Sequence, residues 1–169
     1  MSDTSYKIEA IIEIPVGSRN KYEWDEKHGR MRLDRVLHAS VHYPTDYGFI
    51  AETLAPDGDT LDILVLAEEP VFPGCLVDAR VLGVLHMRDQ GEDDYKIVAV
   101  EMTDPRLENL ETLSDLAPHR LKEIETFFNT YKDLEGGQTL IIGWDDRESA
   151  MKIIAECRLA FAAASTSKP

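Results

Sequence analysis

The sequence contains few cysteines, few basic residues and no long apolar run. Only Cys75 and Cys157 occur among the 169 residues, far apart and in no ligand spacing, so no disulfide framework is expected. The longest apolar runs, such as residues 63–67, fall well short of the ~20 residues that a membrane helix needs. No Gly-x-x-x-x-Gly-Lys phosphate loop is present. We therefore expect a soluble cytoplasmic protein without a membrane partner.

The shortage of basic residues is concentrated in the middle of the chain. There are 32 acids against 18 lysines and arginines, which gives a net charge of -14. Residues 51–104 alone hold 13 acids and 3 bases. Such a surface repels phosphate backbones, so nucleic acid is not an expected partner and cations are. With 43% hydrophobic residues, the chain is apolar enough to fold, and we expect one domain over residues 1–169.

Alternating and β-branched segments predict a mainly β fold. Strands are expected over residues 6–14, 31–37, 61–66, 77–87, 95–102 and 139–144. Residues 43–48 are expected to form a loop that carries two phenols. At least five strands with short turns favour a small barrel.

Two amphipathic helices are predicted in the last third. Apolar residues recur at three- and four-residue steps after Pro118 and through Tyr131, and again from Ala150 to Phe161. Asp145 is a candidate cap for the second helix, with Glu148 as its partner three residues later. The small polar segment 162–169 is expected to be a flexible tail.

Three carboxylates in six residues, in Asp57-Gly58-Asp59-Thr60-Leu61-Asp62, are the sharpest chemical feature. In an extended chain Asp62 faces away from the other two, unless the bend at Gly58 rotates it. By itself this motif is also compatible with a solvated turn. A second acidic turn over residues 88–94 is, by itself, more typical of a hydrophilic hairpin. Together the two turns supply several carboxylate oxygens, which favours Mg²⁺.

Cations and phenols elsewhere in the sequence could bind a phosphate. Each is compatible with an ordinary surface or core role when it is considered alone. Together with a carboxylate–metal cluster, they form the kind of set that a polyphosphate requires. The set consists of Lys21, Arg35, Tyr43, Tyr47, Tyr131 and Lys132.

Seven motifs in order resemble family I soluble inorganic pyrophosphatases, from about Glu9 to Glu135. They are Ile12–Pro15, Lys21–Glu23, Asp34–Arg35, Tyr43–Gly48, Asp57–Asp62, Asp89–Lys96 and Phe127–Glu135. Thr60 departs from the proline that is usual in the family, which removes no ligand. The resemblance implies a five-stranded OB-like β-barrel with two flanking α-helices. It also implies Mg²⁺-dependent hydrolysis of pyrophosphate to two orthophosphates, with Mn²⁺ as a possible substitute, and a homohexamer as in many bacterial members.

The resemblance also implies roles for individual residues. Metal ions would be held by Asp57, Asp62, Asp89 and Asp94, with Glu13 and Glu23 as further metal carboxylates. Phosphate would be bound by Lys21, Arg35, Tyr47, Lys96, Tyr131 and Lys132, with Tyr43 behind them. Asp59 would be the general base that takes a proton from the attacking water, and Asp94 is the alternative. His28 and His86 are expected to have surface or packing roles.

A different class of function, a non-catalytic OB-type binding module or a cation buffer, is the competing hypothesis. A module that binds single-stranded nucleic acid would carry lysines and arginines between aromatic residues on its β-strands, whereas the middle β-strands here are acidic.

Overall fold

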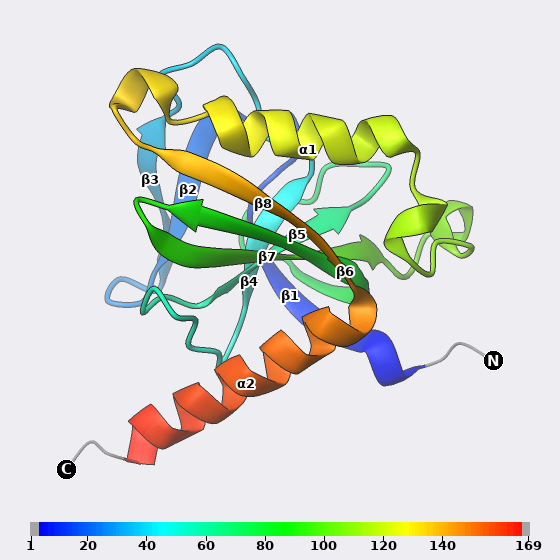
Figure 1. The fold of residues 1–169 in the computed structure, drawn as a ribbon. Helices are drawn as coiled ribbons and strands as arrows, with labels where there is room; N and C mark the ends of the chain where they lie inside the picture. Colours follow the sequence, from blue (N-terminus) through cyan, green and yellow to red (C-terminus); the bar gives the residue numbers. More distant parts are fainter. Residues whose placement is uncertain (1–3, 167–169) are drawn as a thin grey trace.

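The computed structural model describes residues 4–166 of the chain (Figure 1). Its elements, in chain order, are η1 (Thr4–Tyr6), β1 (Lys7–Ile14), β2 (Asn20–Asp25), β3 (Arg30–Val36), β4 (Asp46–Ile50), β5 (Leu61–Leu66), β6 (Leu76–Asp89), β7 (Glu92–Glu101), η2 (Pro105–Leu107), η3 (Leu113–Asp115), α1 (Pro118–Thr130), η4 (Asp133–Glu135), β8 (Thr139–Asp146) and α2 (Arg147–Thr166).

Five strands close into a ring. They are hydrogen-bonded in the order β1-β4-β5-β7-β6, and β6 pairs back to β1. Only the β5–β7 pair in this ring is parallel. Strand β8 pairs with residues 83–89 of β6, on the same edge where β1 pairs with residues 76–80, while β2 and β3 form a separate two-stranded sheet. The predicted mainly β fold with five central strands and two helices is confirmed.

The two helices cover two different hydrophobic clusters. Along β5 the side chains alternate, so that Ile63 packs in the cluster against α2 and Leu64 in the cluster against α1. Figure 1 shows α1 and α2 on opposite sides of the strands. Fully burying one such aliphatic side chain stabilises the fold by about 1.5–3 kcal/mol. No helix within residues 4–166 is both long and apolar enough to cross a membrane.

Strand β4 corrects the prediction that residues 43–48 form a loop. All five residues of β4 are buried. Asp46 resembles a turn residue in the sequence, but its Oδ1 accepts a hydrogen bond from the backbone N–H of Val16 at 2.8 Å. Gly48 is required by close packing, because a Cβ there would lie 1.9 Å from the carbonyl oxygen of Ile11. Both residues serve tertiary contacts that local sequence patterns do not reveal.

Helix α2 differs from its prediction at both ends. Asp146, and not Asp145, accepts the hydrogen bond from a first-turn backbone N–H, that of Ser149, at 2.9 Å. The predicted cap was therefore one residue too early. The helix continues to Thr166, so residues 162–166 of the expected flexible tail are helical. Residues 167–169 lie outside the described residues.

Candidate active site

An open cavity of about 580 Å³ brings together residues from six strands, the β2–β3 turn, the loop before β5 and the end of α1. All the predicted site residues except Arg35 and Tyr43 line it. The lining includes Glu13, Lys21, Glu23, Tyr47, Asp57, Asp59, Asp62, Asp89, Asp94, Lys96, Tyr131 and Lys132. The cavity therefore unites the two acidic turns with the cations and phenols.

The first acidic turn lies just outside β5. Gly58 has a φ of +90°, a conformation that other residues rarely adopt, and the Asp57 carboxylate accepts a hydrogen bond from the Asp59 N–H at 3.0 Å. Strand β5 begins only at Leu61. In an extended chain the Asp62 side chain would face away from those of Asp57 and Asp59. Because the chain bends at Gly58, all three line the cavity.

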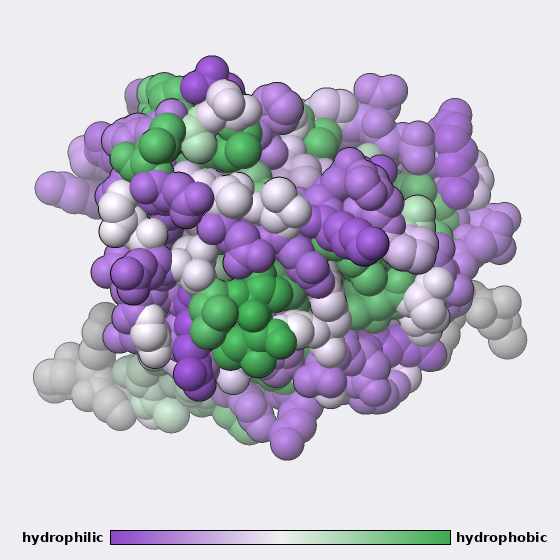
Figure 2. Space-filling view, turned by 45° about the horizontal axis from the view of Figure 1, so that its top comes forward, coloured by the Kyte–Doolittle hydropathy of each residue, from purple (hydrophilic) through white to green (hydrophobic). Residues whose placement is uncertain are grey.

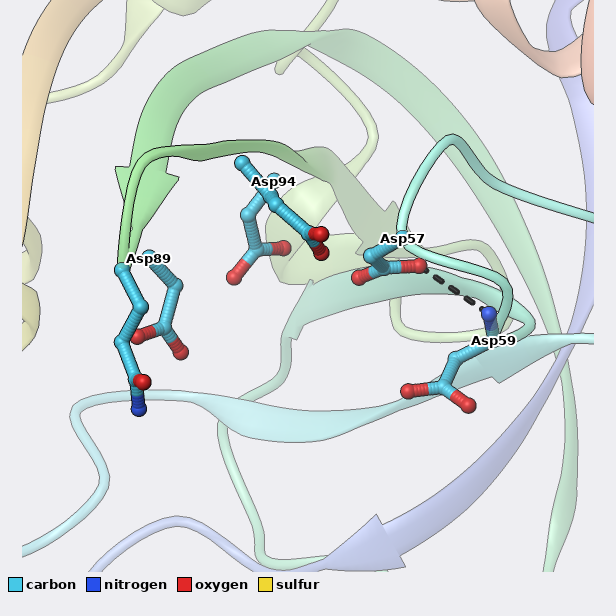
Figure 3. A pocket seen from close by; sticks show the side chains of 6 residues that line it. Asp57, Asp59, Asp89 and Asp94 are labelled. Carbon is cyan, nitrogen blue, oxygen red and sulfur yellow. Dashed lines mark hydrogen bonds between the residues drawn. The ribbon is translucent and has the colours of Figure 1, made fainter.

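The second acidic segment is mostly strand, and not the seven-residue turn that was predicted. Only Gln90 and Gly91 lie between β6 and β7, and both have positive φ, as a two-residue hairpin requires. Asp89 ends β6, and Asp94 lies two residues into β7. Figure 3 shows Asp89 and Asp94 facing the same hollow as Asp57 and Asp59.

Lys96 is the central cation of the site. Its side chain is 3% exposed, and Nζ lies 2.5 Å from Asp62 Oδ2 and 2.8 Å from Asp94 Oδ1. Nζ also donates a hydrogen bond to the hydroxyl of Tyr47 at 3.0 Å. Burial by itself lowers the pKa of Lys96, but the nearby acidic groups, first of all Asp62, hold it well above its usual value. Lys96 is therefore charged and fixed between two carboxylates.

The other basic residues also have acidic partners. Lys132 pairs with Asp89, and Lys21 pairs with Glu23 and lies 3.7 Å from Asp34. These contacts leave both lysines at the cavity wall.

The two predicted residues outside the lining each lie next to a residue that lines the cavity, Arg35 beside Lys21 and Tyr43 beside Tyr47. Arg35 Nε donates to Glu135 Oε1 at 2.5 Å, and its Nη1 donates to Asp34 at 2.6 Å. Tyr43 is buried, with its ring centre 5.3 Å from that of Tyr47. Tyr43 therefore supports Tyr47.

Burial and mutual repulsion act on the carboxylates of the cavity. Burial raises the pKa of Asp94 and of Asp57, and the neighbouring charge of Asp62 raises both further. Burial also raises the pKa of Glu13 to about 7, although its Oε2 accepts a hydrogen bond from the Trp24 N–H at 2.7 Å. A cation in the cavity would relieve this repulsion.

The donor set fits a hard cation such as Mg²⁺. Within residues 4–166, no three acidic, histidine or cysteine side chains converge closely enough to hold a metal by themselves. Mg²⁺ does not require such a cage, because it commonly uses one or two carboxylates with water and substrate oxygens. Asp89 Oδ1 is buried and has no hydrogen-bond partner in the described structure, as expected for an oxygen that a cation would satisfy.

Some residues near the site were given no role by the sequence analysis. Trp24 lines the cavity, and Glu135 holds Arg35, but a single tryptophan or glutamate gives no sequence signal of such a contact. His28 pairs with Asp25, and His86 lies 3.2 Å from Asp145. Neither histidine lines the cavity, and the surface or packing roles expected for them stay predictions.

Comparison with known proteins supplies independent information. Residues 10–162 match the family described as inorganic pyrophosphatase. An inorganic pyrophosphatase of Halalkalibacterium halodurans is 54% identical over 150 residues, which cover 89% of this chain and 92% of that protein. An inorganic pyrophosphatase of Geobacillus stearothermophilus is 51% identical, with 89% and 91% covered. The crystal structure of the Thermus thermophilus inorganic pyrophosphatase superposes with a TM-score of 0.91 at 40% identity, with 96% and 95% covered.

Proposed function

This chain belongs to the inorganic pyrophosphatase family, and we propose that it hydrolyses pyrophosphate to two orthophosphates with the help of Mg²⁺ ions. The observation that carries the proposal is the cavity, where an acidic wall, formed by the Asp57–Asp62 segment and the β6–β7 hairpin, meets lysines and phenols. The competing roles of a cation buffer or a nucleic acid module do not explain why those basic groups are placed beside the carboxylates.

The acidic wall is the proposed metal site. Asp57, Asp62, Asp89 and Asp94 would hold the metal ions, with Glu13 and Glu23 as additional carboxylates. When bound, Mg²⁺ (or Mn²⁺) supplies charge neutralisation of the phosphates and lowers the pKa of water. The buried, unpartnered oxygen of Asp89 and the repulsion around Asp62 support this assignment.

The basic residues and phenols are the proposed phosphate-binding set. Lys21, Lys96 and Lys132 bring fixed positive charge to the cavity, and Arg35 on β3 is paired across the ladder with Lys21. Tyr47 and Tyr131 line the same cavity, and burial raises the pKa of both phenols, so they stay neutral hydrogen-bond donors. Such groups stabilise the charge that develops on phosphate oxygens during the reaction.

Asp59 is the proposed general base, and Asp94 is the alternative. The Asp59 side chain is exposed, and no hydrogen bond or ion pair within residues 4–166 engages its carboxylate. Asp94 is 8% exposed and already bound by Lys96. A carboxylate that lines the cavity without a partner is better placed to take a proton from water, which favours Asp59.

Phosphate release from pyrophosphate tests the proposal. We expect the folded protein to release orthophosphate in millimolar Mg²⁺ and to stop when a chelator removes the metal, with activity restored by added Mg²⁺. Circular dichroism in chelator would verify that the chain stays folded. Absence of phosphate release in Mg²⁺ from folded protein would overturn the proposal and favour a binding role.

We also propose that the protein is cytoplasmic and assembles with copies of itself as a hexamer. Large apolar side chains remain exposed, among them Leu140 (58%) and Ile142 (55%) on β8. Figure 2 shows apolar patches between hydrophilic residues on one face of the molecule. Such patches commonly mark contact surfaces. Sedimentation, compared with the chain mass of 19.1 kDa, distinguishes a monomer from a hexamer.

A further inference from the structure

Glu135 connects two parts of the molecule that carry different phosphate-binding residues. It lies at the end of η4, just after α1, and its Oε1 accepts a hydrogen bond from Arg35 Nε at 2.5 Å. Arg35 belongs to β3, one hundred residues earlier in the chain. Tyr131 and Lys132 immediately precede η4. One carboxylate therefore joins the β2–β3 sheet to the turn that carries Lys132.

The contact is special among those of the β2–β3 sheet. The ion pairs of Lys21, Asp25, Arg32 and Asp34 all remain inside this sheet. Among the described residues, Arg35 to Glu135 is the only ion pair that leaves it. The sheet shares no ladder with the main sheet, so this ion pair restrains its position relative to the cavity, together with the hydrogen bond from the Trp24 N–H to Glu13 of β1.

Holding Arg35 also holds Lys21. The two residues are paired across β2 and β3, and the ladder is irregular directly after Lys21. Lys21 lines the cavity. Both proposed phosphate-binding residues of this sheet therefore lie at the point where Glu135 anchors it.

The turn that carries Glu135 also fixes Lys132. The N–H groups of Glu135 and Gly137 donate to the carbonyl oxygen of Lys132, at 2.9 and 3.2 Å. Gly136 has a φ of +75°, and a Cβ on Gly137 would lie 2.9 Å from Lys132 Cβ. The position of Lys132 against Asp89 therefore depends on the same short turn.

The burial of Glu135 indicates that its contact with Arg35 is more than an ordinary surface ion pair. The side chain is 13% exposed, and Oε2 is buried without a hydrogen-bond partner in the described structure. An unsatisfied buried carboxylate oxygen lowers stability. A buried glutamate that served packing alone would lower stability without any compensation. The ion pair with the Arg35 guanidinium supplies that compensation.

We propose that Glu135 is a positioning residue that fixes the spacing between the Lys21–Arg35 pair and Lys132. The inference rests on the proposed function, in which these three cations bind the phosphates of the substrate. Glu135 touches neither substrate nor metal in this scheme and acts through Arg35. Its loss misplaces the cations and lowers kcat/KM for pyrophosphate by about 10- to 100-fold, because small displacements of positioning groups are costly in catalysis.

The test is a double-mutant cycle with Arg35. We expect Glu135→Ala to lower kcat/KM strongly in the wild-type background and hardly at all in the Arg35→Ala background. Asp133→Ala is the matched control: it removes the same charge from an exposed residue of the same turn, and kcat/KM should stay within about 2-fold. Equal losses in both backgrounds, or no loss in Glu135→Ala, would overturn the proposal. If Glu135→Ala fails to fold, Glu135→Gln enters the same cycle with the same criteria.

A second measurement separates this inference from the proposed function. Amide hydrogen exchange over residues 20–36 should accelerate in Glu135→Ala and stay unchanged in Asp133→Ala. Unchanged exchange in Glu135→Ala would contradict the anchor even if the wild-type enzyme is active. An inactive wild-type enzyme in Mg²⁺ would instead contradict the proposed function, while the exchange result would still decide whether Glu135 anchors the sheet.

Discussion

Asp59→Asn is expected to lower kcat for pyrophosphate hydrolysis by about 10²- to 10⁴-fold while the protein still binds Mg²⁺. The asparagine has the same shape but cannot take a proton from water. Asp59 is exposed at the cavity, and its carboxylate has no hydrogen bond or ion pair within residues 4–166, so the substitution leaves no buried charge uncompensated. The change should therefore affect the reaction and not the fold or the remaining carboxylates.

Steady-state kinetics and Mg²⁺-dependent thermal unfolding together check this prediction. The rise in Tm with Mg²⁺ should be nearly the same in Asp59→Asn and in the wild-type protein, because ligand stabilisation follows metal affinity. Asp93→Asn is a suitable control, since Asp93 pairs with Arg88 and does not line the cavity. If Asp59→Asn keeps the wild-type kcat, the base must be another carboxylate, with Asp94 the first candidate.

Lys96→Met should give the second large effect, on stability as well as on activity. The substitution leaves two carboxylates, Asp62 and Asp94, close together without the ammonium that separates them. Removing one partner of a buried ion pair lowers the free energy of unfolding by about 3–5 kcal/mol. In Mg²⁺ we expect a smaller loss, because the metal ion offsets the repulsion between the same carboxylates.

Denaturant unfolding in chelator and in Mg²⁺ measures the loss in the free energy of unfolding of Lys96→Met without and with the metal. Lys152→Met is the matched control: its exposed side chain lies 3.9 Å from Glu156, and the effect should be within about 0.5 kcal/mol. A loss in Lys96→Met that is the same with and without Mg²⁺ would show that these carboxylates do not hold the metal. Activity of Lys96→Met should also fall, because the phosphate loses its most buried cation.

Elements with a strong local pattern could be predicted from the sequence. Leu61–Leu66 is a strand with the predicted bounds, because its apolar run ends at clear turn signals. Helix α1 begins at Pro118 and buries Ile124, Phe127 and Phe128, as their spacing indicates. Features that depend on distant partners could not be predicted. Residues 46–50 form a strand because Gly48 fits against Ile11, a contact that no local pattern contains.

In the candidate site, too, features with a local sequence pattern could be predicted and features that depend on distant contacts could not. The carboxylates were recognisable because three of them occur in six residues, and the resemblance to a family assigned the dispersed cations. Glu135 ends one of the family motifs but received no role, since its contact with Arg35 spans one hundred residues. The direction of Asp62 was also undecided, because it depends on the backbone conformation at Gly58.

The net charge of -14 is reconciled with a polyanionic substrate by the way the charges are arranged. The acids concentrate in residues 51–104, and five of them line the cavity: Asp57, Asp59, Asp62, Asp89 and Asp94. The lysines of the wall are already paired with carboxylates, so by themselves they leave little positive charge for pyrophosphate. Metal ions bound to the carboxylates of the acidic wall would free the lysines to bind pyrophosphate.

The most direct test of this account is calorimetric titration of the folded protein with imidodiphosphate, a pyrophosphate analogue with a nitrogen in place of the bridging oxygen. The account predicts binding in Mg²⁺ and no measurable binding at the same concentrations in chelator, because the acidic wall repels the analogue until metal is bound. Binding of equal affinity with and without Mg²⁺ would contradict it.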